Sequence, residues 1–206
     1  MLLRRLRRFA RTGAADELDL EDTIEATANN AGLLEIRVRP ERHNAVKVIL
    51  LFDIGGSMDA YVRLCEQLFS AARSEFKHMK TLYFHNFIYE SLWRTNELKE
   101  GELIPTMDVI HKYGPDYKVI IVGDAAMGTH EILRVGASVD FDNIEPGAAW
   151  LKRLTDFYEK VVWLNPEPQK HWKYSSSTTL VQELMEDRMY SLTPKGIEKA
   201  IRYLSR

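Results

Sequence analysis

Residues 46–57 read VKVILLFDIGGS, and this stretch decides the fold. The run up to Phe52 is nearly continuous in apolar and β-branched residues, which is typical of a central strand buried on both faces. Asp53 ends the run, and Gly55 and Gly56 permit a tight turn after it. We therefore expect a buried strand whose carboxyl end carries a polar loop.

Further strand and helix signals alternate along the chain. Val119 to Val122 and Val161 to Leu164 have the same buried-strand character. Apolar residues at helical spacing mark three helices, with the stripes Leu64, Cys65, Leu68, Phe69, Ala72 and Phe76, then Trp150, Leu151, Leu154, Phe157 and Tyr158, then Ile197, Ala200, Ile201 and Leu204. This alternation favours an α/β fold, a Rossmann-like three-layer sandwich with a mostly parallel central sheet and helices on both faces. Ligands of such sheets bind beyond the carboxyl ends of the strands.

Two weaker patterns complete the main part of the chain. Leu34, Ile36 and Val38 alternate with charged neighbours, which predicts a half-exposed edge strand that Pro40 stops. Thr193 precedes a proline, and this pair is typical of a helix start.

The first 32 residues differ in character from the rest. Five arginines stand near the start, at Arg4, Arg5, Arg7, Arg8 and Arg11. An acidic run follows, in which Asp19 or Asp22 caps a short helix that we expect to end soon after Ala28. The segment has too few large apolar residues to fold alone. We therefore divide the chain into a basic and acidic N-terminal appendage, residues 1–32, and a main domain, residues 33–206.

Composition and charge exclude several classes of protein. The 206 residues are 45% hydrophobic and 28% charged, as in ordinary globular domains, and the net charge is −2. That charge argues against nucleic acid as a partner. No apolar run approaches the roughly 18 residues that a membrane span needs. Cys65 is the only cysteine, which excludes an internal disulfide and favours a reducing compartment, the cytoplasm.

Two aspartates mark the carboxyl ends of buried strands. Asp53 follows the first of them, and Asp124 comes soon after Val122. If the two strands are neighbours, both carboxylates emerge at the same rim, where they repel each other unless a cation lies between them. A hard divalent cation prefers oxygen ligands, and Ser57 offers a hydroxyl nearby. The same residues also have simpler interpretations, with Asp53 and Ser57 ordering a loop or capping a helix and Asp124 accepting local amides.

A resemblance to a known family sharpens this hypothesis. Residues 51–58, LFDIGGSM, resemble the first segment of the metal-ion-dependent adhesion site of von Willebrand factor A (VWA) domains, whose pattern is Asp-x-Ser-x-Ser. Thr106 stands where that family has a threonine on a second loop, although a plain helix cap is its other interpretation. Asp124 stands where the family has a later aspartate. Within the family the chain resembles the bacterial CoxE-like proteins over residues 20–206, through GLL at 32–34, RVRP at 37–40, WLNP at 163–166 and LTPKG at 192–196.

The resemblance implies a VWA fold and a metal site. Its ligands to Mg²⁺ or Mn²⁺ are Asp53, Ser57, Thr106 and Asp124. Gly55 departs from the pattern, because the family has a hydroxyl ligand there. An ion that keeps an extra water still fits the remaining ligands, with lower affinity, and complete loss of metal binding is the alternative. Of the six histidines, His85 alone lies at a strand end near this rim, and its other interpretation is a hydrogen-bonded turn residue.

The function that the resemblance implies is protein interaction rather than catalysis. In the family the metal completes its shell with a carboxylate of a partner protein, and CoxE-like proteins resemble partners of MoxR-type AAA+ ATPases that mature or remodel other proteins. We therefore expect a non-enzymatic, cytoplasmic adaptor. One alternative is a structural VWA module without metal that binds partners through its exposed surface. The other is a metal-dependent, phosphatase-like hydrolase, which needs a general acid two residues after Asp53, where this chain has Gly55.

Overall fold

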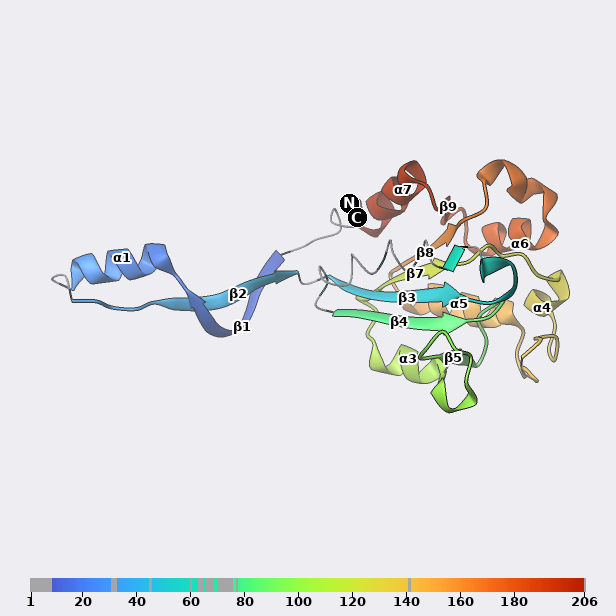
Figure 1. Ribbon diagram of the computed structural model, residues 1–206, viewed down its shortest axis with the longest axis horizontal. Helices are drawn as coiled ribbons and strands as arrows, with labels where there is room; N and C mark the ends of the chain where they lie inside the picture. Colours follow the sequence, from blue (N-terminus) through green and yellow to red (C-terminus); the bar gives the residue numbers. More distant parts are fainter. Residues whose placement is uncertain are drawn as a thin grey trace.

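The computed structural model describes most of the chain (Figure 1). The described residues are 9–30, 33–44, 46–59, 61–62, 65, 69, 76, 78–140 and 142–205. Several residues of the predicted patterns lie outside them, namely Arg4, Arg5, Arg7, Arg8, Leu64, Leu68 and Ala72, and of Arg11 only the backbone is described.

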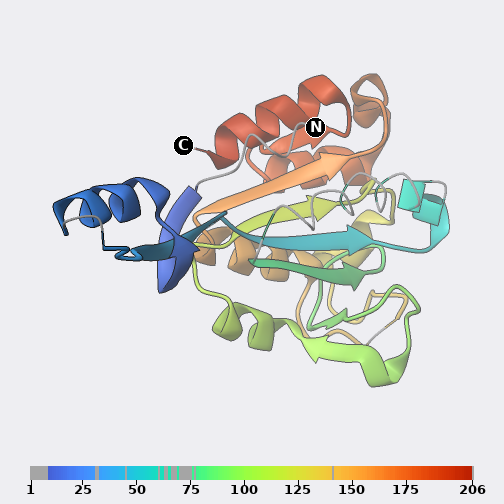
Figure 2. The same cartoon turned by 60° about the vertical axis from the view of Figure 1, so that its left-hand side comes forward.

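A seven-stranded sheet with the order β6-β5-β4-β3-β7-β8-β9 forms the centre of the part of the chain that follows residue 46 (Figures 1 and 2). Its strands are β3 Lys47–Asp53, β4 His78–Phe84, β5 Ser91–Trp93, β6 Leu103–Pro105, β7 Lys118–Val122, β8 Lys160–Asn165 and β9 Met189–Ser191. β3 pairs in parallel with β4 and β7, and parallel pairing continues through β8 to β9. β5 and β6 add an antiparallel edge. The mostly parallel α/β sheet predicted from the sequence is therefore confirmed.

Helices cover both faces of this sheet. They are α3 Thr106–Lys112, α4 Thr129–Leu133, α5 Gly147–Phe157, α6 Ser176–Leu184 and α7 Pro194–Leu204, with the 3₁₀ segments η2 Gly56–Met58, η3 Glu100–Glu102 and η4 Gln169–Tyr174. α7 packs on one face, and α3 and α5 pack on the other (Figures 1 and 2). None of the helices in the described part of the chain is long and apolar enough to cross a membrane.

The side chains of β3 alternate between two cores. Ile49 and Leu51 belong to a cluster that includes residues of α3, α5 and α6. Leu50 and Phe52 belong to a second cluster that includes residues of α7. Successive side chains of a strand point to opposite faces, so a strand that is apolar throughout needs cover on both. The expected three-layer arrangement follows from this strand.

The helical stripes predicted from the sequence are largely confirmed. Thr193 caps α7 through its side chain, and the described members of the first stripe are buried: Cys65, Phe69 and Phe76. Phe157 is an exception, because it is 37% exposed. It is the last residue of α5, and the next residue, Tyr158, takes the buried position instead.

The described residues between 9 and 44 form an arm that extends away from the sheet (Figure 1). The arm consists of β1 Phe9–Leu18, α1 Leu20–Asn29 and β2 Val38–Asn44, and β1 pairs with β2 in a separate two-stranded sheet. Asp19 caps α1 as predicted, since its side chain accepts the N–H of Asp22 at 3.3 Å. The predicted division between residues 32 and 33 falls inside this arm.

The predicted edge strand at residues 34–38 is wrong. Residues 33–37 form no strand, and β2 begins at Val38, runs through Pro40 and pairs with β1 instead of the central sheet. Pro40 lies opposite Ala15, at a point where the register shifts. Proline is tolerated there because both strands of a two-stranded ribbon are edge strands, to which proline is largely confined in sheets.

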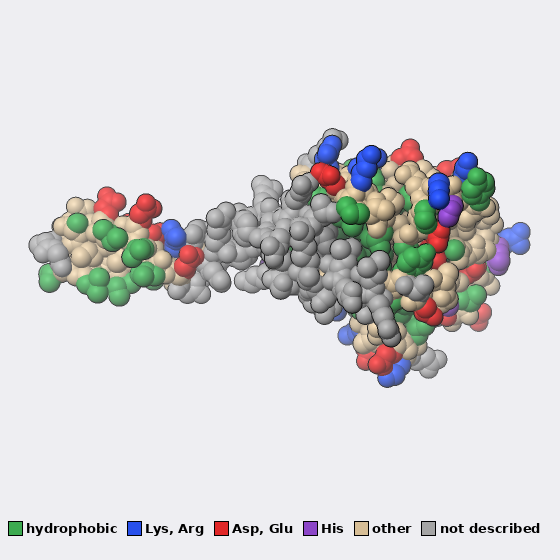
Figure 3. All heavy atoms as spheres, turned by 45° about the horizontal axis from the view of Figure 1, so that its top comes forward, with side chains coloured by type: hydrophobic (Ala, Val, Ile, Leu, Met, Phe, Trp, Pro, Cys, Tyr) green, Lys and Arg blue, Asp and Glu red, His purple; other side chains and the backbone are tan. Residues whose placement is uncertain are grey.

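The arm exposes many of its apolar side chains, which Figure 3 shows on its surface. They are Leu18, Leu20, Ile24, Leu33, Leu34, Ile36 and Val38, each at least half exposed. Thr23 is the only buried residue of α1. Exposed apolar surface of this extent commonly marks an interaction site.

Candidate metal site at the ends of β3 and β7

Asp53 and Asp124 come together at the carboxyl ends of two neighbouring strands. β3 and β7 are adjacent and parallel, with Phe52 opposite Val122. Asp53 is the last residue of β3, Asp124 follows β7 by two residues, and each is only 3% exposed. The condition stated from the sequence, that the two strands are neighbours, is met, and two buried carboxylates share one rim of the sheet.

Burial and the second carboxylate make Asp53 hard to ionise. The pKa of Asp53 is raised well above its usual range, first because burial removes the carboxylate from water and second because Asp124 is negatively charged. The backbone N–H groups of Asn86 and Ile54 partly oppose this shift, and the bond from Asn86 to Asp53 Oδ1 is 3.0 Å long. A cation between the two carboxylates would remove their repulsion.

Asp124 is held by its own turn and by a neighbouring strand. Its Oδ1 accepts the N–H of Ala126 at 2.9 Å, and its backbone carbonyl accepts Nδ2 of Asn165 at 2.8 Å. The interpretation of Asp124 as an acceptor for a local amide is therefore correct for this oxygen. Its Oδ2 receives no hydrogen bond from the described residues, so it remains available to a cation.

The loop after β3 turns at two glycines and presents Ser57. Gly55 has a φ of 86° and Gly56 a φ of 55°, in the left-handed region that side chains disfavour. Ser57 lies in η2 and is exposed. Gly55 occupies the N-cap of η2, and the interpretation of Ser57 as a cap of the helix that follows stays a prediction.

Thr106 is buried at the start of α3. Its Oγ1 donates to the carbonyl of Tyr89 at 2.6 Å, and Pro105 occupies the N-cap position, so the helix-cap interpretation of Thr106 is wrong. β6 precedes Thr106, and β4 and β5 separate β6 from β3 in the sheet. The strand order thus brings Asp53 and Asp124 together without placing Thr106 beside them, and its role as a ligand stays a prediction.

His85 lies at the same rim and reaches over the turn. Its Nδ1 is 2.9 Å from Oδ2 of Asp140. The other edge of the ring faces Gly55, since a Cβ at residue 55 would lie 3.2 Å from both Cδ2 and Nε2 of His85. The imidazole therefore fills the space beside residue 55, where the VWA pattern has a hydroxyl.

Residues that the sequence did not single out brace this rim. Asn86 donates through its backbone to Asp53 and through Nδ2 to Oε2 of Glu131 at 2.9 Å. Glu90 accepts the N–H of Ile144 through Oε1 at 2.7 Å, and so fastens the loop that carries Asp140. The only sequence signal for Asn86 is its type, because asparagine tolerates the positive φ of 59° that it adopts in this turn.

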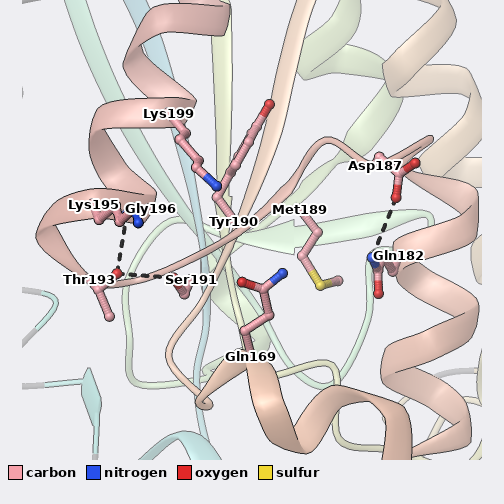
Figure 4. Close-up of a pocket in the computed structure, with 10 residues that line it drawn as sticks. All are labelled: Gln169, Gln182, Asp187, Met189, Tyr190, Ser191, Thr193, Lys195, Gly196 and Lys199. Atoms are coloured by element: carbon pink, nitrogen blue, oxygen red, sulfur yellow. Dashed lines mark hydrogen bonds between the residues drawn. The ribbon is translucent and has the colours of Figure 1, made fainter.

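A cavity of about 350 Å³ lies elsewhere, beside β9 and the start of α7 (Figure 4). Lys195 and Lys199 line it from α7, and Gln182 and Asp187 line it from the opposite side, where they form a hydrogen bond of 3.4 Å. The four predicted ligands are not among its lining residues, so the cavity is separate from the candidate metal site.

Among the described residues, no group of three or more His, Cys, Asp or Glu side chains is close enough together to hold a metal ion. The carboxylate pair suits a divalent cation in charge and chemistry, but it supplies only two of the ligands that such an ion needs. An ion bound there would need neutral oxygens or waters as its further ligands.

The parallel sheet with its antiparallel edge, and the aspartates at two adjacent strand ends, define an α/β fold of the VWA class. The sequence model of the family described as VWA domain containing CoxE-like protein matches residues 1–101, and over these residues the chain belongs to the CoxE-like VWA family. The match includes Asp53 and Ser57 and ends before Thr106 and Asp124. No curated protein and no solved structure matches the chain.

Proposed function

We propose that this chain is a protein-interaction module with a degenerate metal-ion-dependent adhesion site, and that it acts as an adaptor with a MoxR-type AAA+ ATPase in protein maturation or remodelling. The observation that carries the proposal is the buried carboxylate pair of Asp53 and Asp124. Such a pair is costly to keep ionised without a cation, and hard divalent ions take carboxylate oxygens. Membership of the CoxE-like VWA family supports the adaptor role.

The ion is Mg²⁺ or Mn²⁺, held by the two aspartates. Ser57 adds a hydroxyl from its exposed position after the glycine turn. Thr106 adds another only if it releases its bond to the carbonyl of Tyr89. Gly55 supplies no ligand, so water fills the open positions and the affinity is low.

A carboxylate of the partner protein takes one of these open positions. The loop after α4 supports a docking role for this rim, because it carries Asp140 and exposes large apolar side chains. Those side chains are Val135, Val139 and Ile144, with exposures of 61%, 63% and 77%. Apolar residues around a charged site are typical of a surface that receives a partner.

A non-enzymatic role fits the chemistry of the turn better than hydrolysis does. A phosphatase-like mechanism needs a general acid two residues after Asp53. Gly55 stands there and has no proton to transfer. Turnover of a generic phosphate monoester that disappears in Asp53→Ala would reverse this preference.

The test has two stages. Calorimetric titration of the metal-stripped chain with Mg²⁺ and Mn²⁺ should show saturable binding that is lost in Asp53→Ala. Immobilised chain should then capture a purified MoxR-type ATPase, and EDTA or Asp53→Ala should reduce the capture. Capture that is absent under every metal condition would exclude the adaptor role.

A module that binds its partner without metal is the second candidate. The exposed apolar side chains of the arm favour it, since they offer a docking surface far from the carboxyl end of β3 in Figure 1. Under this candidate EDTA has no effect on capture of the ATPase, whereas changes in the arm abolish it.

A further inference from the structure

The cavity beside β9 is built partly from a segment that the candidate metal site does not use. Thr193, Lys195 and Gly196 belong to the segment 192–196, LTPKG, and all three line this cavity of about 350 Å³. Gly196 lets α7 lie directly against β9, because a Cβ at this residue would overlap the backbone carbonyl of Ser191. Thr193 caps the same helix through its side chain. This wall of the cavity is therefore held in place by close packing and by a helix cap.

Two lysines give the same wall a positive charge. Lys195 and Lys199 are four residues apart on α7, so they lie on one face of the helix, where like charges repel each other. Neither lysine forms an ion pair or a hydrogen bond with the described residues. Among those residues Asp187 is the only acid that lines the cavity, and it lies on the opposite side from α7 (Figure 4). The α7 side of the cavity therefore favours an anion.

Two hydroxyl groups beside the lysines leave one proton to donate. Oγ of Ser191 lies 3.0 Å from Oγ1 of Thr193, which also accepts the N–H of Gly196 at 3.2 Å. The pair holds two O–H protons, and only one of them can lie in the bond between the two oxygens. The other proton has no acceptor among the described residues, so it is available to an anion beside the lysines.

The opposite side of the cavity presents hydrogen-bond acceptors. Nε2 of Gln182 donates to Oδ1 of Asp187 at 3.4 Å. The amide oxygen of Gln182 and the second carboxylate oxygen of Asp187 receive no hydrogen bond from the described residues. Such oxygens bind hydroxyl groups, because a hydroxyl donates one proton. The cavity is thus suited to an anionic group at one end and to hydroxyls at the other.

We propose that this cavity binds a small phosphate monoester of a polyol, with its phosphate against the two lysines and its hydroxyls against Gln182 and Asp187. A phosphate monoester carries a charge of about −1.5 to −2 at pH 7, which matches two lysines better than the single charge of a carboxylate does. The volume lies at the lower end of the roughly 300–1,000 Å³ of ligand pockets, which suits a ligand the size of a sugar phosphate. The four predicted metal ligands do not line the cavity, so the inference does not depend on the metal site.

The experiment titrates the full chain with glucose 6-phosphate, inorganic phosphate and glucose, and follows binding by calorimetry and by backbone amide shifts in NMR spectra. The parent should bind glucose 6-phosphate more tightly than either of its parts, with amide shifts at Ser191 and Lys195. Lys199→Gln should weaken binding of both phosphates about tenfold, because it removes a charged donor. Lys170→Gln is the matched control, since Lys170 is an exposed lysine of η4 that does not line the cavity. Circular dichroism checks that each variant is folded.

A second variant tests the hydroxyl side of the cavity. Asp187→Asn should weaken glucose 6-phosphate binding about threefold or more without weakening the binding of inorganic phosphate. Inorganic phosphate that binds as tightly as the ester would overturn the polyol assignment.

Three further results would overturn the inference as a whole. The first is the absence of saturable glucose 6-phosphate binding in the millimolar range. The second is an equal loss of affinity in Lys199→Gln and Lys170→Gln, which would assign the binding to general surface charge. The third is tighter binding of a phosphoserine peptide than of glucose 6-phosphate, which would assign the lysines to a protein ligand. None of these results bears on the metal site, which the titrations with Mg²⁺ and Mn²⁺ test separately.

Discussion

Gly123 lies so close to Asp53 that a Cβ at residue 123 would be 2.9 Å from Cβ of Asp53 and 3.0 Å from its Oδ2. The same glycine accepts a hydrogen bond from Nε1 of the buried Trp163 at 2.7 Å through its carbonyl. The end of β7 is thus fixed against the end of β3. The position of the Asp53 carboxylate depends on the absence of a side chain at residue 123.

Replacing this glycine should therefore disturb both the site and the fold. In Gly123→Ala the new methyl group forces Asp53 or the strand end to shift, and overpacking of this kind costs about 1–3 kcal/mol of unfolding free energy. Metal binding should weaken with it. Urea unfolding and calorimetry measure the two effects, and Gly101→Ala serves as the control because a Cβ there meets nothing within 4 Å. Equal stability of the two variants would show that the rim is looser than these contacts indicate.

The stability of the metal-free chain should fall as the pH rises, because of Asp53. The pKa of Asp53 is raised in the folded state by burial and by Asp124. Between the ordinary aspartate pKa of about 4 and this raised value, the folded chain holds a proton that the unfolded chain has released. The unfolding free energy therefore decreases with pH across this interval, and the penalty is complete above the raised pKa.

Asp53→Asn should remove that part of the pH dependence and be more stable than the parent at the alkaline end. Urea unfolding in EDTA from pH 4 to pH 8 measures it, with Asp108→Asn on the exposed side of α3 as the control. A bound divalent ion should restore the parent's stability at high pH, because it binds the ionised carboxylates of the folded state. If the unfolding free energy of Asp53→Asn fell with pH as steeply as that of the parent, the assignment of this pH dependence to Asp53 would be wrong.

Restoring the family's serine should not repair the site. Gly55→Ser places a side chain at a φ of 86°, where it is strained, and against the ring of His85 at 3.2 Å. Gly56→Ser is the matched control, because it also has a positive φ, of 55°, but meets nothing within 4 Å. Each should lose about 1–3 kcal/mol through backbone strain, and Gly55→Ser should lose more than Gly56→Ser. A smaller loss of stability in Gly55→Ser than in Gly56→Ser would contradict the crowding.

The sequence predicts the central sheet because three of its strands are almost entirely apolar. β3, β7 and β8 are apolar on both faces, and this pattern has few alternatives to a covered parallel strand. The sequence leaves open whether β3 and β7 are neighbours, and their pairing in the structure brings Asp53 and Asp124 to one rim. The short elements carry no comparable signal, since α4 has 5 residues and β9 has 3, and their form depends on the neighbours against which they pack.

The arm and the outer part of the site could not be predicted for different reasons. β2 contains Pro40 and few apolar residues, so nothing in its composition reveals a partner in β1. Thr106 stands between a proline and a helix, and this pattern does not predict that its hydroxyl donates a hydrogen bond to the carbonyl of Tyr89. The pair of His85 and Asp140 joins residues 55 positions apart, and a contact of that range arises from the fold rather than from local sequence.

The apolar surface of the arm gives a last prediction, which separates the two docking surfaces. Ile24 and Leu34 are 61% and 74% exposed, so replacing either with aspartate should change the unfolding free energy by no more than about 0.5 kcal/mol. If the arm binds the ATPase, Ile24→Asp and Leu34→Asp should each reduce capture at least about tenfold with or without EDTA, since a charge would be buried in an apolar interface. Ile144→Asp is the matched control, because Ile144 is equally exposed at 77% but lies on the loop that carries Asp140. Loss of capture in Ile144→Asp alone would instead place the partner at the metal site, because that substitution leaves the arm untouched.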